Sequence, residues 1–419
     1  MYLWLIPMAY VGASVVCGVA LPRIEQAYLG APSLNLSVAS AQAYLSAAAS
    51  GMMALTGIVF AMAFVMVQFS AIAYSPRLVL WFARDRVLFH SLGAFSATFI
   101  LALFTLAWVD RGGSGTVPLL SSILVATMII GSMLLFSRLV QRLSDLQITN
   151  VLQLTGDKGR EVIRDMFERP QGKPAASPAQ ARTAGTQLGP TSQALSYSGE
   201  PRTVAILDIP ALVEQARRAD AVIVMKCAVG DALVEGSPLL QVHGAKSPLA
   251  ENMLTRGIRL DRERTFEQDP KYPIRLLVDI AIKALSPAIN DPTTAVQTID
   301  QIEDLLRRLG RHDLDTGYAS DASGVLRLVF PMPTWEDYLA LAFDEIRQYG
   351  ATSVQVLRRM RSALVGLMES LSCAERIEAV HRYLAHLDLV IDHSTLDAED
   401  RQMAHQEDRQ GLGLSRGAP

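Results

Sequence analysis

The N-terminal third of this 419-residue chain has very few charged residues. The whole chain has 38 basic and 41 acidic residues, which are 19% of all residues, but only eight of them lie within residues 1–137. The hydrophobic fraction is 50% and the mean hydropathy is +0.24. A soluble protein has about 25% charged residues. This distribution excludes a wholly soluble enzyme, a disordered protein and a collagen-like chain, and it predicts a membrane region followed by a water-soluble region.

Cysteine is also scarce, and sequence motifs for common chemistry are missing. Three cysteines form no disulfide framework, which indicates a reduced, cytoplasm-facing compartment. The net charge of −3 argues against a nucleic-acid partner. The sequence has no phosphate-binding loop, dinucleotide fingerprint, paired-cysteine zinc motif or metalloprotease motif. We therefore expect no catalytic residues, metal or cofactor, and an enzyme is the less favoured class.

Four apolar segments are long enough to cross about 30 Å of hydrocarbon, which requires about 20 residues. Within a domain of residues 1–137 they are residues 1–21, 50–74, 88–109 and 117–136. The first has no positive residue before its apolar run, so we interpret it as a retained span and not a cleaved signal peptide. The expected fold class is a membrane α-helical domain of four transmembrane helices joined to a cytoplasmic α+β region.

Basic residues are concentrated in two of the segments that flank these spans. The loop between the second and third spans carries Arg77, Arg84 and Arg86, and the segment after the fourth begins with Arg138 and Arg142. The other two loops carry one basic residue each. Positive segments face the cytoplasm. We therefore expect both termini and the large soluble region to be cytoplasmic.

Polar side chains within the spans are few. Gln68, Ser70 and Thr98 are candidates for lining a pore or for helix packing, because polar groups in lipid are costly and often mark function. A set of small residues occurs in and just before the second span: Ala47, Gly51, Ala54 and Gly57. Small residues allow close helix contact, so we expect packing within a bundle or a homo-oligomer in the lipid bilayer.

The soluble region divides into five segments by composition. Residues 138–168 keep helical periodicity and predict a connecting helix. Residues 169–202 are rich in Pro, Ala, Gly, Ser and Thr and predict a disordered linker. Short apolar runs with glycine turns in residues 203–243 predict a small β-rich module. Residues 244–395 predict a helical cytoplasmic domain, with a strand before its last helices, and residues 396–419 predict a disordered tail.

A turn between two amphipathic helices, residues 286–295 (SPAINDPTTA), is the most distinctive segment of the soluble region. Ser-Pro ends one helix and Asp-Pro begins the next. Two interpretations stay open. In one, the turn is a helix cap, with an ion pair nearby between Arg262 or Arg264 and Asp269 or Asp279. In the other, hydroxyls and a helix N-terminus bind an anionic ligand, although the turn's own aspartate would repel it. The candidate ligand-binding residues are Arg262, Asp269, Asp279, Ser286, Asn290, Asp291, Thr293 and Thr294.

Three segments carry a family resemblance. They read RTFEQD (residues 264–269), LVDIAIKALSPAINDPTTAV (277–296) and ALTGIVFAMAFVMVQFSAIAYSPRLVLWFARD (54–85). In these segments the chain resembles domain-of-unknown-function family 2254, predicted bacterial membrane proteins, and the resemblance extends over nearly the whole chain apart from the linker and the tail. Residues 271–273 (KYP) depart from it, since relatives are expected to have a glycine-containing turn there. The resemblance implies a bacterial inner-membrane protein but no activity.

These observations predict a non-enzymatic channel or transport component with a cytoplasmic regulatory domain. The alternative is a membrane-anchored sensor or scaffold that binds a cytoplasmic ligand or protein. An intramembrane serine protease rests only on residues 112–115 (GGSG). We reject it, because His90 is the only histidine of the membrane region and is expected at the opposite face, out of reach of that serine.

Overall fold

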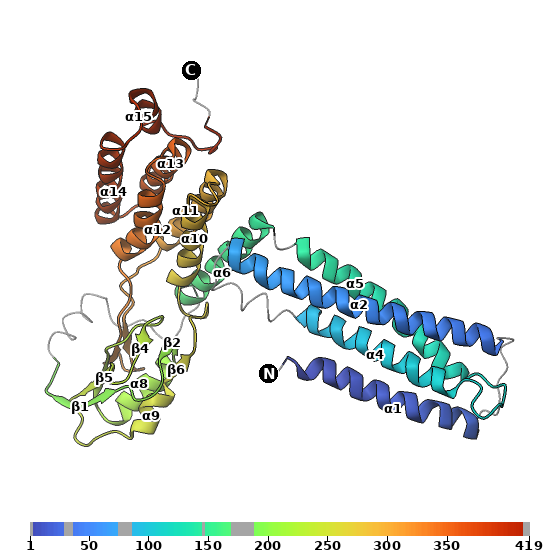
Figure 1. The fold of residues 1–419 in the computed structure, drawn as a ribbon. Helices are drawn as coiled ribbons and strands as arrows, with labels where there is room; N and C mark the ends of the chain where they lie inside the picture. Colours follow the sequence, from blue (N-terminus) through green and yellow to red (C-terminus); the bar gives the residue numbers. More distant parts are fainter. Residues whose placement is uncertain (1–2, 29–36, 74–85, 145–146, 169–187, 414–419) are drawn as a thin grey trace. The chain divides into compact units, whose positions relative to one another are not determined.

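The structure is a computed structural model, and it describes residues 3–28, 37–73, 86–144, 147–168 and 188–413. Contacts divide the chain into two compact units, Met1–Asn150 and Val151–Pro419. Figure 1 shows both units, coloured along the chain, with labels on all the helices and most of the strands.

The first unit is built from four long apolar helices. They are α1 (Leu5–Tyr28), α2 (Val38–Ala73), α4 (Arg86–Trp108) and α5 (Leu119–Ser144). All four are long and apolar enough to cross a membrane, which confirms the predicted fold class for this region. Several boundaries differ from the prediction, most clearly at the second helix, which begins at Val38 and not near residue 50. Hydropathy marks the part of a helix that fits the hydrocarbon, whereas backbone hydrogen bonding continues beyond it.

Helix α4 contacts the other three helices of this unit. Its contact with α1 is close because small residues face large ones. A Cβ atom added to Gly18 would lie 2.6 Å from Cβ of Phe104, and one added to Gly93 would lie 2.8 Å from Cδ2 of Tyr10. Ser14 Oγ also donates a 2.6 Å hydrogen bond to the carbonyl oxygen of Ala97. Small-residue packing of this kind is typical of membrane helices.

The second unit contains a β-module of two sheets and two short helices. The larger sheet has the strand order β1-β5-β3-β8-β7, and the smaller has the order β4-β2-β6. The bounds are β1 (Thr191–Ser196), β2 (Arg202–Leu207), β3 (Val222–Met225), β4 (Ala232–Leu233), β5 (Pro238–His243), β6 (Ile258–Asp261), β7 (Tyr318–Ser320) and β8 (Leu326–Val329), with helices α8 (Ile209–Arg218) and α9 (Glu251–Arg256). All pairs are antiparallel except β3 with β8. Leu212, Ile223, Leu240 and Leu328 lie in its buried core.

The β-module is larger than predicted, and its strands correct two of the predicted segments. β1 lies inside the expected linker, of which residues 169–187 are outside the described residues. β6 and β7 lie inside the segment expected to be helical, whereas β8 is the strand that was predicted before the last helices. β1 buries only Leu195, so its composition resembles a linker; pairing with β5 gives it structure. Pairing between strands far apart in sequence leaves no mark on local composition.

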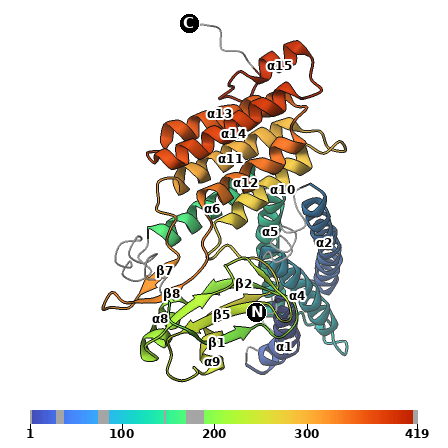
Figure 2. The ribbon, with the colours of Figure 1, turned by 90° about the vertical axis from the view of Figure 1, so that its left-hand side faces the viewer.

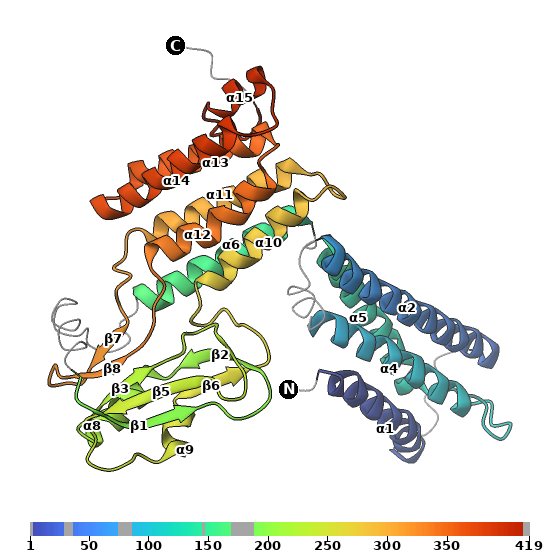
Figure 3. The same ribbon diagram turned by 60° about the vertical axis from the view of Figure 1, so that its left-hand side comes forward.

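Helices form the rest of the second unit. They are α6 (Ile148–Phe167), α10 (Lys271–Ala284), α11 (Pro292–Leu309), α12 (Trp335–Tyr349), α13 (Val354–Ser370), α14 (Ala374–Asp392) and α15 (Ala398–Ala404). Figure 2 shows α11 to α14 as a layered bundle above the β-module, and Figure 3 shows α6 beside α10 and α11. The apolar periodicity predicted α12, α13 and α14, and the structure confirms all three. The predicted connecting helix of residues 138–168 is instead the end of α5 followed by α6.

The predicted disordered tail is also corrected by the structure, because residues up to 413 are described and packed. The buried carboxylate of Asp408 accepts hydrogen bonds from the backbone nitrogens of Gln410, Gly411 and Gly413 at 3.0, 2.9 and 2.6 Å. Arg358 on α13 donates from Nη1 to the carbonyl oxygen of Gly413 at 2.9 Å. The tail is polar, but its polar groups are paired with the protein. Composition alone therefore misjudged it.

Candidate functional site

A buried carboxylate lies where the β-module meets the helices of the second unit. Asp269 immediately precedes α10, and its side chain is only 1% exposed. Its Oδ1 accepts a 3.1 Å hydrogen bond from the backbone nitrogen of Lys271, and its Oδ2 lies 3.3 Å from Nε of Arg264. One of the predicted ion pairs, Arg264 with Asp269, is thus confirmed. Burial raises the pKa of Asp269, although the charges of Arg264 and Lys271 act to lower it.

The same two cations hold a loop of the β-module. Nε of Arg264 donates to the carbonyl oxygen of Gly230 at 3.1 Å, and Nζ of Lys271 donates to that of Val229 at 3.3 Å. Gly230 has φ of +90°, and a Cβ atom there would lie 2.5 Å from both Nη2 of Arg264 and Oδ2 of Asp269. Only glycine fits this position, because it lacks the Cβ atom and tolerates positive φ.

Three buried polar atoms in these segments have no hydrogen-bond partner among the residues that the structure describes. They are Oδ2 of Asp269, Oγ1 of Thr265 and the hydroxyl oxygen of Tyr338. Burial raises the pKa of Tyr338, and the nearby charge of Asp269 adds to the shift. Natural proteins rarely leave buried polar groups without a hydrogen-bond partner. Each of these atoms therefore indicates a protonated carboxyl group, a bound water or a bound ligand at this position. Asp269 with Arg264, Lys271 and Tyr338 forms the Asp269 cluster, which is the candidate functional site. A buried acid of raised pKa is typical of such a site.

The turn of residues 286–295 forms a helix cap. Oδ1 of Asp291 accepts from the backbone nitrogen of Thr294 at 3.1 Å, and the Thr294 hydroxyl donates to Oδ2 of Asp291 at 2.6 Å. Oγ of Ser286 donates to the Lys283 carbonyl oxygen at 2.7 Å, and Asn290 has φ of +49°. The predicted cap is therefore confirmed. Thr293 is exposed beside it. Because Asp291 already occupies the first turn of α11, this geometry gives no support to an anion there.

The other predicted ligand residues lie apart from this turn. Asp279 on α10 forms a 2.5 Å ion pair with Nη2 of Arg275, which also pairs with Glu345 of α12. Arg262 is exposed, and its backbone nitrogen donates to Oδ1 of Asp261. The predicted set is thus distributed over the Asp269 cluster, a bridge between α10 and α12, and the helix cap.

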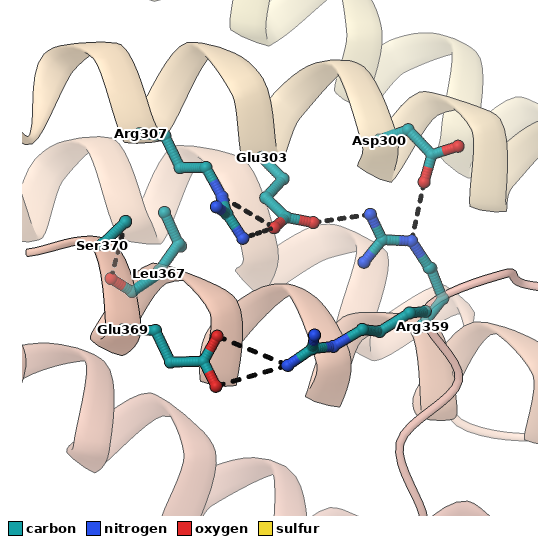
Figure 4. A network of polar contacts seen from close by, with 8 residues as sticks. Asp300, Glu303, Arg307, Arg359, Leu367, Glu369 and Ser370 are labelled. Carbon is teal, nitrogen blue, oxygen red and sulfur yellow. Dashed lines mark hydrogen bonds and ion pairs between the residues drawn. The ribbon is translucent and has the colours of Figure 1, made fainter. Parts of the chain in front are cut away.

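Sequence reasoning missed a charged network between α11 and α13. Figure 4 shows the guanidinium of Arg359 between Asp300 and Glu303 of α11, at 2.7 and 2.5 Å. Glu303 also pairs with Arg307 at 2.5 Å. The side chain of Arg359 is buried. The signal in the sequence was an arginine pair at apolar-face positions of a helix (LRRM, residues 357–360), which predicts buried partners.

The three residues predicted to line a pore or to pack helices lie on two helices, Gln68 and Ser70 on α2 and Thr98 on α4. Thr98 is buried between α4 and α5, where its hydroxyl donates to the Ala94 carbonyl oxygen and lies 3.2 Å from Oγ of Ser132. Gln68 on α2 is exposed. Ser70 also lies in α2, but its side chain is outside the described residues. Thr98 therefore acts in helix packing, and no polar path is defined by these residues within one described chain.

The chain matches the family model described as "Predicted membrane protein (DUF2254)" over residues 2–365. It belongs to this family. The match includes the four membrane helices, the Asp269 cluster and the capped turn of this DUF2254 protein. In the part of the chain that is described, no group of three His, Cys, Asp or Glu side chains is arranged to hold a metal ion.

Relatives of this DUF2254 protein are found in mycobacteria. It is 27% identical to "Uncharacterized protein Mb1321c" of Mycobacterium bovis over 378 residues, which cover 87% of this chain and 70% of the relative. The same identity and coverage relate it to "Uncharacterized protein Rv1290c" of Mycobacterium tuberculosis. No solved structure matches the chain. The comparisons establish a membrane protein family, and the names of the relatives carry no activity.

Proposed function

We propose that this protein is a channel or transport component of the bacterial inner membrane, regulated by its cytoplasmic domain. The observation that carries the proposal is the attachment of α6. This helix follows the fourth membrane helix and is packed into the soluble unit. Nη1 of Arg160 donates to Oδ2 of Asp304 on α11 at 2.7 Å, and a Cβ atom on Gly159 would lie 2.7 Å from Leu305. α6 is therefore fixed to α11 of the soluble unit, and it is the next helix of the chain after the membrane helix α5.

The proposed orientation places the soluble unit and both termini in the cytoplasm. Basic residues support this orientation through the positive-inside bias. They lie before and at the start of α4 (Arg77, Arg84 and Arg86) and at the end of α5 (Arg138 and Arg142). In this orientation, a cytoplasmic signal reaches the membrane through α6.

Self-association is part of the proposal. Ala47, Gly51, Ala54 and Gly57 of α2 are exposed in one chain, and nothing lies within 4 Å of a Cβ atom added to Gly51 or Gly57. Small residues of this spacing support close contact with a helix of another copy. Because Thr98 is engaged in packing within one chain, we place the path for solutes between copies and not inside one bundle.

Flux through liposomes tests this function directly. Purified full-length protein should make vesicles permeable to at least one common ion or small solute. Gly159→Leu, which displaces Leu305, should change that flux, whereas Lys158→Leu alters an exposed residue of the same helix and should not. Vesicles that stay impermeable to all common ions and solutes would refute a channel or transport role. Equal flux in the two variants would refute regulation through α6.

The second candidate function is a membrane-anchored sensor or scaffold, and the Asp269 cluster favours it. Its buried oxygens without a hydrogen-bond partner support binding of a small polar ligand at the contact between the β-module and the helices. Thermal-shift screening of the full chain in detergent, with metabolites and nucleotides, would find such a ligand. A shift that is lost in Asp269→Asn and Tyr338→Phe but kept in Asp291→Ala would place it at the cluster. A shift kept in all three variants would exclude both the cluster and the capped turn.

A further inference from the structure

Helices α6 and α11 lie parallel, as a series of contacts shows. Gly156 lies against the side chain of Gln301, and Arg160 is paired with Asp304. Farther along, the ring of Phe167 stacks on His312 with centroids 5.3 Å apart. Residue numbers increase along both helices from one contact to the next. The start of α6 is therefore level with the first turn of α11, and Figure 3 shows the two helices side by side.

This register shows which end of the soluble unit is joined to the membrane helices by the short link before α6. α6 begins at Ile148, four residues after α5 ends at Ser144, and a link of that length spans at most about 14 Å. The 26 residues of α5 rise about 39 Å, close to the thickness of a bilayer with its headgroups, about 40–45 Å. The α10–α11 turn, which precedes the first turn of α11, therefore lies at the end of α6 that a few residues link to α5.

Exposed apolar side chains gather at this same end. Ile289, in the turn, is 43% exposed, and the neighbouring Pro287 and Ala288 are also exposed. Tyr349 is 52% exposed at the end of α12, next to Gly350, which lies against Leu285 of α10. Leu412 is 68% exposed, next to Gly411, which contacts Val296 of α11.

These three side chains are a large share of the exposed apolar residues of the soluble unit. Among the described residues after 150, only six large hydrophobic side chains are strongly exposed: Val234, Ile289, Val325, Tyr349, Leu389 and Leu412. Exposed apolar side chains that gather in one patch are typical of a protein-contact or membrane-contact site. The carboxylate next to it, Asp291, is hydrogen-bonded to Thr294, which lowers the cost of bringing it close to lipid.

We propose that the tip formed by Pro287, Ala288, Ile289, Tyr349 and Leu412 docks onto the surface of the lipid bilayer. Its apolar side chains enter the headgroup region, where exposed aromatic and aliphatic groups are favourable. The soluble unit is then held to the membrane at two points, the covalent link before α6 and this tip. The proposal rests on the membrane location of the family and not on a channel or sensor activity.

Depth-dependent fluorescence quenching in liposomes tests the docking. The background is the full chain with Cys17→Ala and Cys373→Ser. The third cysteine, Cys227, is buried, which shields it from the dye. Ile289→Cys and Tyr349→Cys are labelled with an environment-sensitive dye and exposed to lipids that carry a nitroxide near the headgroup. The matched controls are Val325→Cys and Val234→Cys, which replace side chains of the β-module that are 47% and 54% exposed. The β-module contacts the residues just before and at the start of α10, whereas the tip lies at the end of α10.

We expect the dye at both tip positions to be quenched several-fold more strongly than the dye at either control position. Equal quenching at tip and control positions would overturn the proposal. Blue-shifted emission at the tip without quenching by the nitroxide lipid would also overturn it, because the tip would then be covered by protein, such as a second copy. All the labelled residues are exposed, so none of these substitutions removes a core contact.

Discussion

Replacing Gly230 with alanine measures how firmly the β-module is joined to the Asp269 cluster. The left-handed backbone of this position, φ of +90°, costs a residue with Cβ about 1–2 kcal/mol. The new methyl group would also lie 2.5 Å from both Nη2 of Arg264 and Oδ2 of Asp269. Forcing an extra carbon into a packed site costs about 1–3 kcal/mol more. We therefore expect Gly230→Ala to lower the free energy of unfolding by about 2–5 kcal/mol.

Gly236 provides a matched control in the same module. Its φ is +83°, but nothing lies within 4 Å of an added Cβ atom. Gly236→Ala should therefore cost only the backbone term, about 1–2 kcal/mol. Thermal unfolding of the full-length protein in detergent, with a scan for each variant, compares the two. Equal losses of stability in Gly230→Ala and Gly236→Ala would refute the reasoning. They would mean that Arg264 and Asp269 move away from the added methyl group at no cost in folding free energy.

Three further outcomes follow from the ion pairs and the cap. Because the folded pKa of Asp269 is raised, the stability that this group contributes is present at low pH and is lost as pH rises through that pKa. Wild type should therefore lose stability relative to Asp269→Asn as pH rises above the ordinary pKa of an aspartate, about 4, and parallel thermal-unfolding curves would contradict this. Asp291→Ala removes the cap that accepts from Thr294 and should cost about 1 kcal/mol in the same assay, with Asp291→Asn nearly neutral. Arg359→Ala removes the buried guanidinium that pairs with Asp300 and Glu303 and should cost about 3–5 kcal/mol. Arg308→Ala breaks an exposed pair and should cost under about 1 kcal/mol. A ranking in the opposite order would show that the α11–α13 network is not buried in solution.

Features that depend on local sequence could be predicted. Hydropathy identified four membrane helices, apolar periodicity identified α12 to α14, and the Asp-Pro pair identified the start of α11 at Pro292. These patterns are repeated within one element, or lie at its end, so neighbouring residues contain the whole signal. The pairing of Arg264 with Asp269 was one of four combinations that the composition allowed.

Features that depend on distant residues could not be predicted. The C-terminal tail is as polar as a disordered segment, and only the folded α13 supplies the donors that hold it. The importance of Asp269 could not be separated from that of Asp279, since burial distinguishes them and the sequence does not show burial. Gly230 reads as an ordinary turn glycine, and only the structure shows that a cation and a carboxylate lie against it.

The parallel pairing of β3 with β8 has a consequence for how the chain folds. Ile223 is in register with Leu328, so three helices and about a hundred residues are synthesised between the partners. Loops of that length close slowly, and contacts between distant residues slow folding. Until β8 has been synthesised, the edge of β3 that pairs with it stays unpaired, and an unpaired strand edge is a site for aggregation. A fragment that ends before Leu326 keeps that edge open permanently. The soluble unit is therefore best produced with residues up to β8 and beyond in one piece.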